Sequence, residues 1–395
     1  MDALHARIQE LTQELIDLRR DFHAHPELGF EEFRTAEIVE RYLQDLGLQA
    51  QRMATTGVVA VLDSGTPGPV LMLRADMDAL PVTEDTGLPF CSTNPGVMHA
   101  CGHDAHMAML LGAAKVLVEN KDRLKGRIKF VFQPNEENAG ALTMIQEGVL
   151  DNPKVDGVMG LHIWTPLESG KVAVSEGTVM AGLDVFKITV QGRGGHTGFP
   201  HQAVDPVIAA ANLIQTVQTI QTREISQFQP TIIMFGKIQG GTKGNIIPDS
   251  VELEGTIRYL YPAGPESEEQ PTERFKRIVQ SVCEVHRCGC EIVIEHENIP
   301  LVNDSAMAEL ARNVAVDVLG EPEVTSLQSI AGEDFSEFSA RVPGVFLFLG
   351  AGNAAKGTTA PHHNPYFNID EDVLPTGVAL LVRGAFHFCN GQDNA

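Results

Sequence analysis

The order in which helical and strand-like segments follow one another changes twice along this 395-residue chain. Up to about residue 183, short apolar runs such as Val58–Leu62 and Ile128–Phe132 alternate with helical patterns, which indicates an α/β layer with a mixed, largely parallel sheet between helices. Residues 184–297 have a different order, and the α/β alternation returns from residue 298. We therefore predict one α/β domain formed by residues 1–183 and 298–395, interrupted by an inserted domain.

The inserted segment, residues 184–297, has the order strand, helix, strand, strand, helix, strand. This order is that of a ferredoxin-like α+β domain. Alternation of apolar and polar residues predicts the strands, and 3.6-residue spacing predicts the helices. The predicted strands cover residues 184–191, 230–239, 250–260 and 291–296, and the predicted helices cover 205–222 and 268–287.

The charge of the chain excludes some classes of partner. It carries 29 Lys and Arg against 52 Asp and Glu, a formal net charge of −23. Such a field repels phosphate backbones and anionic lipid, so we expect neither nucleic acid nor a membrane as a partner. No apolar stretch approaches about 20 residues and the N-terminus lacks an apolar signal core. Six cysteines in a chain of this length favour a reduced, cytoplasmic protein.

The segment Met98–His106, with the sequence Met-His-Ala-Cys-Gly-His-Asp-Ala-His, is the richest in chemistry. In extended backbone, the side chains of Cys101 and His103 project to the same side and are able to reach one metal ion or two neighbouring ions. Thiolate and imidazole are good zinc ligands. Asp104 is expected to cap the following helix or to accept a hydrogen bond from a ligand histidine. The alternative is a polar loop around a buried cysteine.

A pair of carboxylates, Glu136 and Glu137, follows the strand predicted at Ile128–Phe132. Neighbouring side chains point in different directions, so one is able to bind metal while the other transfers protons. The ordinary alternative is an acidic helix start, where glutamate is favoured by the helix dipole.

Further candidates also follow predicted strands. His162 comes just after Val158–Leu161, and His362-His363 follows a strand at 345–349 by about a dozen residues. Asp76 and Asp78 directly follow a buried strand, as ligands or as partners that orient a ligand histidine. Ligands of open α/β sheets gather beyond the carboxyl ends of strands. Each residue alone has an ordinary explanation as a hydrogen-bonded histidine or a turn residue, but together they complete one ligand set.

A second group of cysteines and a histidine lies in the inserted segment, at Cys283, His286, Cys288 and Cys290. A structural zinc site is one interpretation. The turn is short, however, and Gly289 is expected to cap the preceding helix. We therefore favour an ordinary helix-to-strand turn without a metal.

Six segments together resemble one known family. The chain resembles the aminoacylase and carboxypeptidase family of metallopeptidases, in the amidohydrolase branch of indole-acetyl-amino-acid hydrolases, hippurate hydrolases and N-acyl-amino-acid deacetylases. The resemblance covers essentially the whole chain. It is carried by Arg19–Glu27, Arg74–Pro81, Met98–His106, Gln133–Glu137, Gly194–His196 and Asn245–Asp249.

The resemblance implies hydrolysis of the amide bond of a small N-acyl-amino acid or peptide at two divalent metal ions, whether Zn, Mn, Co or Ni. Cys101 would replace a bridging carboxylate used in other branches. Glu136 would be the general base, with Asp78 among the catalytic residues. The family pattern His-x-Pro-x-Phe selects His363 over His362. The implied metal ligands are Cys101, His103, Glu137, His162 and His363.

The resemblance also gives the inserted domain a role as a lid and dimerisation domain, so we expect a homodimer or a higher homo-oligomer. His196 would stabilise the oxyanion, often in the site of the partner subunit. Asn245 and Arg258 would hold the carbonyl or the carboxylate of the substrate, and arginine suits a carboxylate because it binds in a bidentate way.

Three positions depart from the family pattern: Asn135 where alanine is usual, Asn138 where glycine is usual, and Asn368 where aspartate is frequent. None removes a ligand or the base. Two other functions remain open from the residues alone. One is a cysteine hydrolase with Cys101 as the nucleophile, which would survive chelators but not alkylation. The other is a non-catalytic protein that binds acyl-amino acids or peptides.

Overall fold

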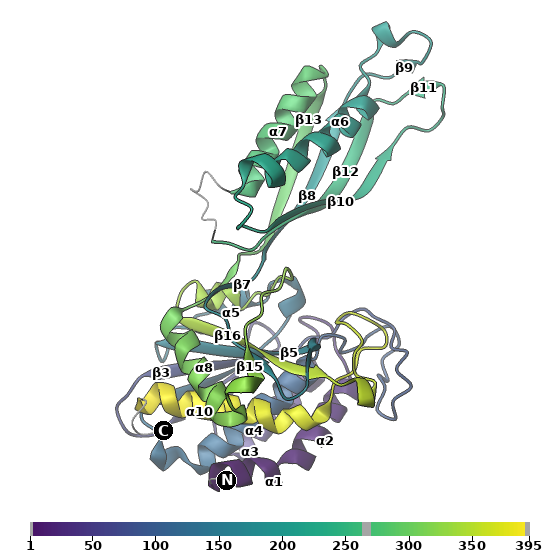
Figure 1. The fold of residues 1–395 in the computed structure, drawn as a ribbon. Helices are drawn as coiled ribbons and strands as arrows, with labels where there is room; N and C mark the ends of the chain where they lie inside the picture. The colour runs from purple at the N-terminus through teal and green to yellow at the C-terminus, as the bar shows by residue number, and fades with distance from the viewer. Residues whose placement is uncertain (1–2, 263–269, 392–395) are drawn as a thin grey trace. The chain divides into compact units, whose positions relative to one another are not determined.

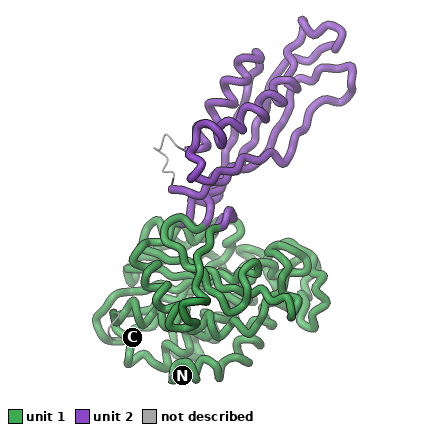
Figure 2. The backbone as a smooth tube through the Cα atoms, in the orientation of Figure 1, with its two compact units in different colours: residues 1–179, 302–328, 333–395 green, residues 180–301, 329–332 purple. Residues whose placement is uncertain are grey.

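The computed structural model describes residues 3–262 and 270–391, and the chain forms two compact units (Figures 1 and 2). Unit 1 contains Met1–Val179, Val302–Gln328 and Glu333–Ala395, and unit 2 contains Met180–Leu301 and Ser329–Gly332. One unit is thus formed from separate stretches of sequence that enclose the other in the chain.

Unit 1 is built on an eight-stranded sheet with the order β1-β2-β4-β3-β5-β16-β6-β15. The four central strands, β4, β3, β5 and β16, are mutually parallel, while β1 and β2 pair in antiparallel fashion at one edge. The prediction of a mixed, largely parallel sheet is therefore confirmed. The strands are β1 Ala50–Met53, β2 Gly57–Asp63, β3 Val70–Asp76, β4 Arg127–Gln133, β5 Gly157–Glu168, β6 Val172–Ala173, β15 Val324–Thr325 and β16 Gly344–Gly352.

The helices of unit 1 cover this sheet, and α4 (His103–Glu119) is buried along almost its whole length. Beyond its first turn its sequence is rich in alanine, leucine and methionine, as expected for a core helix. A Cβ atom at Gly112 would lie 2.6 Å from Leu15 and 3.0 Å from Val378, so this glycine permits close packing against α2 and α10. The other helices are α1 Ala3–Glu10, α2 Thr12–Ala24, α3 Phe33–Asp45, α5 Ala141–Gln146, α8 Ser305–Leu319, α9 Ser336–Ser339 and α10 Leu374–Asn390.

The segment after β4 is less helical than its sequence suggests, because the helix predicted over 138–147 is only α5, Ala141–Gln146. A short 3₁₀ turn, Glu136–Asn138, precedes it. The residues on either side of that turn, Asn135 and Ala139, have φ angles of +54° and +60°. These left-handed conformations interrupt the α-helix and leave the glutamate pair on a tight turn.

Unit 2 carries a four-stranded antiparallel sheet with the order β10-β12-β8-β13. Numbered within the unit this order is 2-3-1-4, the ferredoxin-like arrangement that the sequence predicts. Helices α6 and α7 pack together beside this sheet (Figure 1). The elements are β8 Gly182–Gln191, α6 Pro206–Thr219, β10 Thr231–Gly240, β12 Ser250–Tyr259, α7 Pro271–Val285 and β13 Gly289–Asn298.

Alternation along β8 explains the core of unit 2, since Phe186, Ile188 and Val190 are fully buried while Lys187 and Gln191 are exposed. Two short pairs complete the described strands: β9 (Gly195–His196) pairs with β11 (Ile246–Ile247) in antiparallel fashion, and β7 (Gly177–Met180) pairs with β14 (Leu301–Asn303). The first residues of the helix predicted over 268–287, 268 and 269, lie outside the described residues. Within residues 3–262 and 270–391, no helix is long and apolar enough to cross a membrane.

Candidate metal centre

The candidate ligands are positioned by the parallel centre of the sheet in unit 1. Asp78 follows β3, and the turn with Glu136 and Glu137 follows β4. His162 lies in β5 beyond Gly160, which is the last residue of that strand paired with β3. Parallel strands bring their carboxyl ends to one edge of the sheet, so these side chains meet although they are remote in sequence.

The donor atoms form overlapping groups in which all ligand atoms lie within 4.8 Å of one another. Cys101 belongs to two of these groups, as a thiol shared by two neighbouring cations would. The structure thus brings together the five side chains that the sequence offers as ligands, with Glu136 beside them. Three of the groups contain these residues: Cys101, His103 and His162; Cys101, Glu137 and His363; and His103, Glu136 and Glu137.

The rings of His103 and His162 are each oriented by a main-chain carbonyl. Nδ1 of His103 donates to the carbonyl oxygen of Asp78 at 2.8 Å, and Nδ1 of His162 donates to that of Ile163 at 2.6 Å. A carbonyl accepts only, so both Nδ1 atoms carry hydrogen and both Nε2 atoms keep a lone pair in the neutral ring. The Nε2 of His162 lies 3.5 Å from the Cys101 sulfur.

His363 reaches the site from the loop after β16. Its main-chain N–H donates to the carbonyl of Ala100 at 2.8 Å, which anchors this loop beside Cys101. The φ angle of His363 is +62°, an uncommon conformation for a histidine. Its Nε2 lies 3.3 Å from Oε1 of Glu137, and its side chain is about half exposed, so this ligand position faces solvent.

The donor set fits divalent cations. Nε2 of His103 and Oε1 of Glu137 are buried and have no hydrogen-bond partner among the described residues, although buried polar atoms are almost always bonded. Burial, together with the nearby Glu137 and Glu136 carboxylates, raises the pKa of the Cys101 thiol well above its usual value. A metal ion satisfies the free lone pairs and stabilises the thiolate that the surrounding carboxylates disfavour.

Asp78 holds the glutamate turn instead of pointing at the shared donor atoms. Its Oδ1 accepts the main-chain N–H of Glu136 at 3.0 Å, and its Oδ2 accepts that of Glu137 at 3.1 Å. The backbone of the same residue orients His103. One aspartate therefore fixes three residues of the site relative to one another.

The sequence reasoning missed two acidic residues, Glu333 and Asp334, which lie within reach of Glu136. Both accept hydrogen bonds from the buried Arg74 at 3.0 Å, and the main-chain N–H of Asp334 points to Oε1 of Glu136 at 3.4 Å. Burial and the charge of Glu333 raise the pKa of Glu136 well above its usual value. The signal in the sequence was another adjacent carboxylate pair, but it is one of several in the chain and follows no predicted strand.

Two polar residues of the Met98–His106 segment lie outside the donor groups. His99 is fully buried and has no side-chain partner among the described residues, and burial lowers its pKa to about 4. Asp104 bonds to Arg19 and His23, both at 2.8 Å. The expectation that Asp104 caps α4 or orients a ligand histidine is therefore wrong. Gly102, with φ +95°, occupies the N-cap position instead.

His106 and His362 are also occupied by other partners. Nδ1 of His106 bonds to Asp76 at 2.6 Å, and its Nε2 accepts the main-chain N–H of Ile163 at 2.8 Å. Nε2 of His362 donates to the carbonyl of Ile163 at 2.9 Å, and its ring lies 4.6 Å from that of Trp164. His363, not its neighbour, is thus the histidine of this pair that lies among the donor groups.

The cysteines of unit 2 do not form a comparable group. Cys283 and Cys288 are buried in the apolar core of that unit, and among residues 3–262 and 270–391 no metal-ligating group includes either of them or Cys290. The expected cap at Gly289 is wrong, because Arg287, with φ +60°, holds the left-handed position and Gly289 begins β13.

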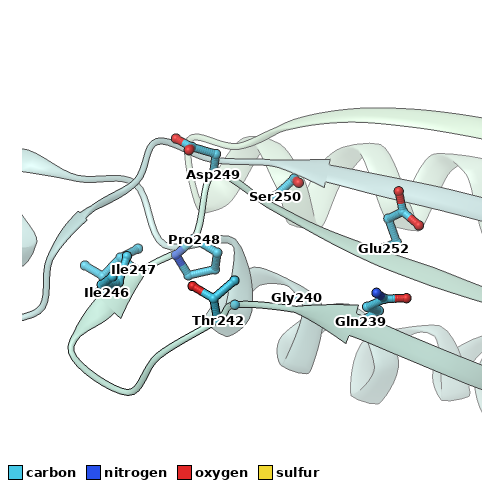
Figure 3. Close-up of a pocket in the computed structure, with 10 residues that line it drawn as sticks. Gln239, Gly240, Thr242, Ile246, Ile247, Pro248, Asp249, Ser250 and Glu252 are labelled. Carbon is cyan, nitrogen blue, oxygen red and sulfur yellow. The ribbon is translucent and has the colours of Figure 1, made fainter.

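The remaining candidates lie in unit 2. His196 in β9 pairs with Ile246 in β11, which brings it next to Asn245, and both line a shallow pocket. An adjoining pocket lies between the ends of β10 and β12 and is lined in part by Ile246, Pro248 and Asp249 (Figure 3). Arg258 in β12 donates to the carbonyl of Ile330 at 3.1 Å, and burial lowers its pKa.

An open α/β sheet with cysteine, histidine and glutamate donors at the carboxyl ends of its strands is the arrangement of a metal-dependent hydrolase. Residues 72–386 match the sequence pattern of peptidase family M20/M25/M40, and the chain belongs to this family. It is therefore an enzyme that hydrolyses amide bonds with divalent metal ions.

Individual relatives agree over nearly the full length. The chain is 40% identical over 394 residues to thermostable carboxypeptidase 1 of Saccharolobus solfataricus, covering 97% of both chains. It is 40% identical to N-acetyl-L-cysteine deacetylase of Bacillus subtilis, covering 98% of this chain and 91% of the relative. The crystal structure of the Bacillus subtilis YXEP protein, described as a dinuclear metal-binding peptidase, is similar with a TM-score of 0.84, 32% identity, and coverage of 97% and 99%.

Proposed function

We propose that this enzyme removes the acyl group from N-acyl-amino acids or small peptides at a two-metal centre. The observation that carries the proposal is that two donor groups, Cys101–His103–His162 and Cys101–Glu137–His363, share one thiol beside Glu136. The names of the relatives, a carboxypeptidase and an N-acetylcysteine deacetylase, support a substrate with an acylated amino acid. Zn, Mn, Co and Ni all suit a site with these ligands.

The ligands are proposed to hold two divalent ions, which supply Lewis acidity for the amide carbonyl and lower the pKa of water. The chain's own part in the reaction is to place these charges and to move protons. Asp78 holds the turn that carries both glutamates, so the ligand Glu137 and the base Glu136 keep a fixed separation. Placing the base in this way contributes rate without further reorganisation during the reaction.

Glu136 is the proposed general base and later the general acid. Its carboxylate accepts a proton from the attacking water, and then passes that proton to the nitrogen of the leaving amine. The raised pKa of this group suits it to hold the proton between the two steps. Its carboxylate lies in a buried environment beside Glu333 and Asp334, whereas its neighbour Glu137 is grouped with Cys101 and His363.

Residues of unit 2 are proposed to bind the substrate. His196 would donate a hydrogen bond to the oxyanion, and Asn245 beside it would hold the carbonyl. Arg258 would meet the free carboxylate of the amino-acid part, since among the described residues it donates one N–H group, to the carbonyl of Ile330, and a guanidinium has further N–H groups to offer. An arginine there would offset the strongly negative charge of the chain.

The proposed assembly is a homodimer formed through unit 2, which is the role assigned to the domain proposed over residues 184–297. Exposed apolar side chains on its edge strand β10, among them Met234 and Ile238, support this assignment. A cytoplasmic location is proposed from the cysteines, all six of which are free thiols.

Two isosteric variants test the assignment of the glutamates. Glu136→Gln should lower the turnover of an N-acetyl-amino acid by about 10²- to 10⁴-fold and leave the bound metal unchanged. Glu137→Gln should lower the metal content itself. The measurements are steady-state kinetics on a panel of N-acyl-amino acids and metal analysis of the dialysed proteins. Near-normal turnover by Glu136→Gln would rule out the proposed base.

The contact between Cys101 and His162 is also the geometry of a cysteine nucleophile with its base. Burial opposes that function, because it raises the pKa of the Cys101 thiol and lowers the pKa of His162, so the ion pair is disfavoured. A cysteine hydrolase would keep its activity in a chelator. The proposed enzyme should lose activity there and regain it when a divalent metal is added back.

A further inference from the structure

Beside the proposed ligands lies a chain of hydrogen bonds that no step of the reaction uses. It begins at Arg74, whose Nη1 donates to Oδ2 of Asp76 at 2.7 Å. Oδ1 of Asp76 bonds to Nδ1 of His106 at 2.6 Å, and Nε2 of His106 meets the main-chain N–H of Ile163 at 2.8 Å. All of these groups are buried. This series of hydrogen bonds therefore links the end of β3 to β5 just beyond Arg74 and Gly160, the last pair between the two strands.

The direction of each bond in this chain follows from its ends. A main-chain N–H only donates, so Nε2 of His106 is the acceptor and carries no hydrogen. The hydrogen of the neutral ring is then on Nδ1 and is donated to the Asp76 carboxylate. Both nitrogens of His106 are used, so this residue has no lone pair left for a metal, although it lies within 4.8 Å of donor atoms of Asp76 and His103.

The carbonyl of Ile163 orients a proposed ligand. It accepts from Nδ1 of His162 at 2.6 Å, which leaves Nε2 of that ring 3.5 Å from the Cys101 sulfur. Ile163 thus donates its N–H to His106 and orients the ring of His162 with its carbonyl. If its N–H lost the acceptor, a buried donor would be unsatisfied and the backbone would move to satisfy it.

We propose that Asp76 and His106 are positioning residues that fix the tautomer and orientation of His162 for metal binding through the main chain of Ile163. The inference rests on the proposed function only in taking His162 as a ligand. Outer partners of metal-binding histidines commonly change metal affinity by 10- to 100-fold when they are removed.

Asp76→Asn is the sharpest variant, because it keeps the shape of the side chain and replaces a single oxygen by nitrogen. If the amide oxygen stays on Arg74, its NH₂ group faces Nδ1 of His106 and forces the hydrogen onto Nε2. Two donors, that N–H and the N–H of Ile163, then oppose each other. His106→Ala removes the acceptor outright, while His106→Gln restores one through its amide oxygen.

A matched control is His23→Gln. His23 is buried and bonds through Nδ1 to a carboxylate, Asp104, at 2.8 Å, as His106 does to Asp76, but no hydrogen bond among the described residues joins it to Ile163. It therefore reports the effect of removing a buried histidine–carboxylate pair that lies outside the hydrogen-bond relay from Asp76 through His106 to Ile163.

The experiment has two readouts on the metal-free full chain. Two-bond ¹H–¹⁵N spectra of the histidine rings should show His162 and His106 as Nδ1–H tautomers in the wild type. Titration with zinc alone against a competing chelator should show an affinity 10- to 100-fold weaker for Asp76→Asn and His106→Ala. His106→Gln should recover much of that loss, and His23→Gln should match the wild type in both readouts.

Two results would overturn the proposal: an Nε2–H tautomer for His162 in the wild type, or wild-type zinc affinity in folded Asp76→Asn and His106→Ala proteins. Equal losses in His23→Gln would mean a general loss of packing and would also overturn it. These readouts are independent of turnover. If the expected tautomers and zinc affinities are found but no acyl-amino acid is cleaved, the positioning role of Asp76 and His106 is supported and the proposed function is wrong.

Discussion

Two regions of this molecule combine cysteine and histidine at short spacing, yet only one of them forms a cluster of metal donors. In unit 1, Cys101 lies within 4.8 Å of the donor atoms of four other side chains taken from four parts of the chain. In unit 2, Cys283 and Cys288 point into apolar packing between a helix and a strand. The difference lies in what surrounds the thiols: strand ends with buried polar groups in one case, and an ordinary hydrophobic core in the other.

The contrast extends to buried charge. Unit 1 buries Arg19, Arg74 and several carboxylates near the strand ends, whereas Asp184 is the only fully buried charged side chain among the described residues of unit 2. Burying a charge lowers stability unless the charge is paired. The stability of unit 1 therefore depends on the pairing of the charged groups buried around its site. Mutations that unpair a buried charge should therefore give the largest difference in stability loss between the two units.

Arg74→Met should have the largest effect. It removes the cation that bonds to Asp76, Glu333 and Asp334, and leaves three buried carboxylates without it. We expect a loss of about 3–5 kcal/mol in the free energy of unfolding, measured by denaturant titration of the metal-free protein. The matched change in unit 2 is Asp184→Asn.

Asp184 bonds to Thr272 and to the largely exposed His296, so its amide replacement leaves no buried charge unpaired. We expect a loss of about 1–2 kcal/mol for Asp184→Asn. Equal losses in the two variants would contradict the view that unit 1 alone depends on a paired polar interior.

The metal itself should give the next largest difference. Cys101→Ser should weaken metal binding at least about 100-fold, because a hydroxyl is a poor substitute for a thiolate ligand shared by two donor groups. The triple variant Cys283→Ser, Cys288→Ser, Cys290→Ser should bind as much metal as the wild type. Metal analysis after dialysis compares them. One metal ion fewer in the triple variant would show that unit 2 holds a structural site after all.

The sequence alone predicts the layers of both units because their elements are set by local periodicity, as in Val58–Leu62 or the alternation along 184–191. It also predicts which candidate loops follow strands. It does not predict that Glu333 and Asp334 join them, because their approach to Arg74 depends on tertiary packing across about 260 residues of chain.

Two predictions made from residue chemistry are wrong, and in both a local partner competes with a tertiary one. Asp104 has the sequence of a helix cap, but the buried Arg19 offers it a stronger, charged partner. Gly289 has the sequence of a helix terminus, but the chain turns two residues earlier, at Arg287. In both cases the folded structure overrides a local preference for a helix terminus that the sequence does show.

The pH dependence of stability should also differ between the units. Lys129 in β4 is buried and donates to the carbonyls of Val149 and Pro153, and burial lowers its pKa from 10.5 to about 8. Between pH 8 and 10.5 the unfolded chain holds this proton while the folded chain releases it, so stability rises with pH across that window. Below pH 8 both states are protonated and the cost of burial is fully present.

The comparison is with Lys129→Met, which lacks the titrating group. We expect wild-type stability to rise relative to this variant by about 2 kcal/mol from pH 8 to 10.5, as measured by urea unfolding. The exposed Lys187 of unit 2 provides the control, since Lys187→Met should show no such trend. A flat difference for Lys129→Met would mean that water reaches the ammonium group.

The smallest expected effect concerns the two tight turns, one in each region, because each places a non-glycine residue in the left-handed conformation. Arg287 has φ +60° at the end of α7, where the N–H of Cys288 bonds to the carbonyl of Cys283 and its own N–H to that of Glu284. This is the position at which glycine commonly ends a helix. Asn135 has φ +54°, but its side chain donates to the carbonyl of Asn138 at 3.0 Å.

Glycine should therefore act in opposite directions at these two positions. Arg287→Gly relieves the backbone strain of an exposed side chain and should raise the free energy of unfolding by about 0.5–1 kcal/mol. Asn135→Gly loses a side-chain hydrogen bond and relieves little backbone strain, because asparagine already tolerates a positive φ. It should lower the free energy of unfolding by about 0.5 kcal/mol. Asn135→Ala should lower it by about 1 kcal/mol or more, since alanine keeps the strain without the bond. Denaturant titration of the three variants decides the matter. A stabilising Asn135→Gly would show that the side chain of Asn135 does not stabilise the glutamate turn.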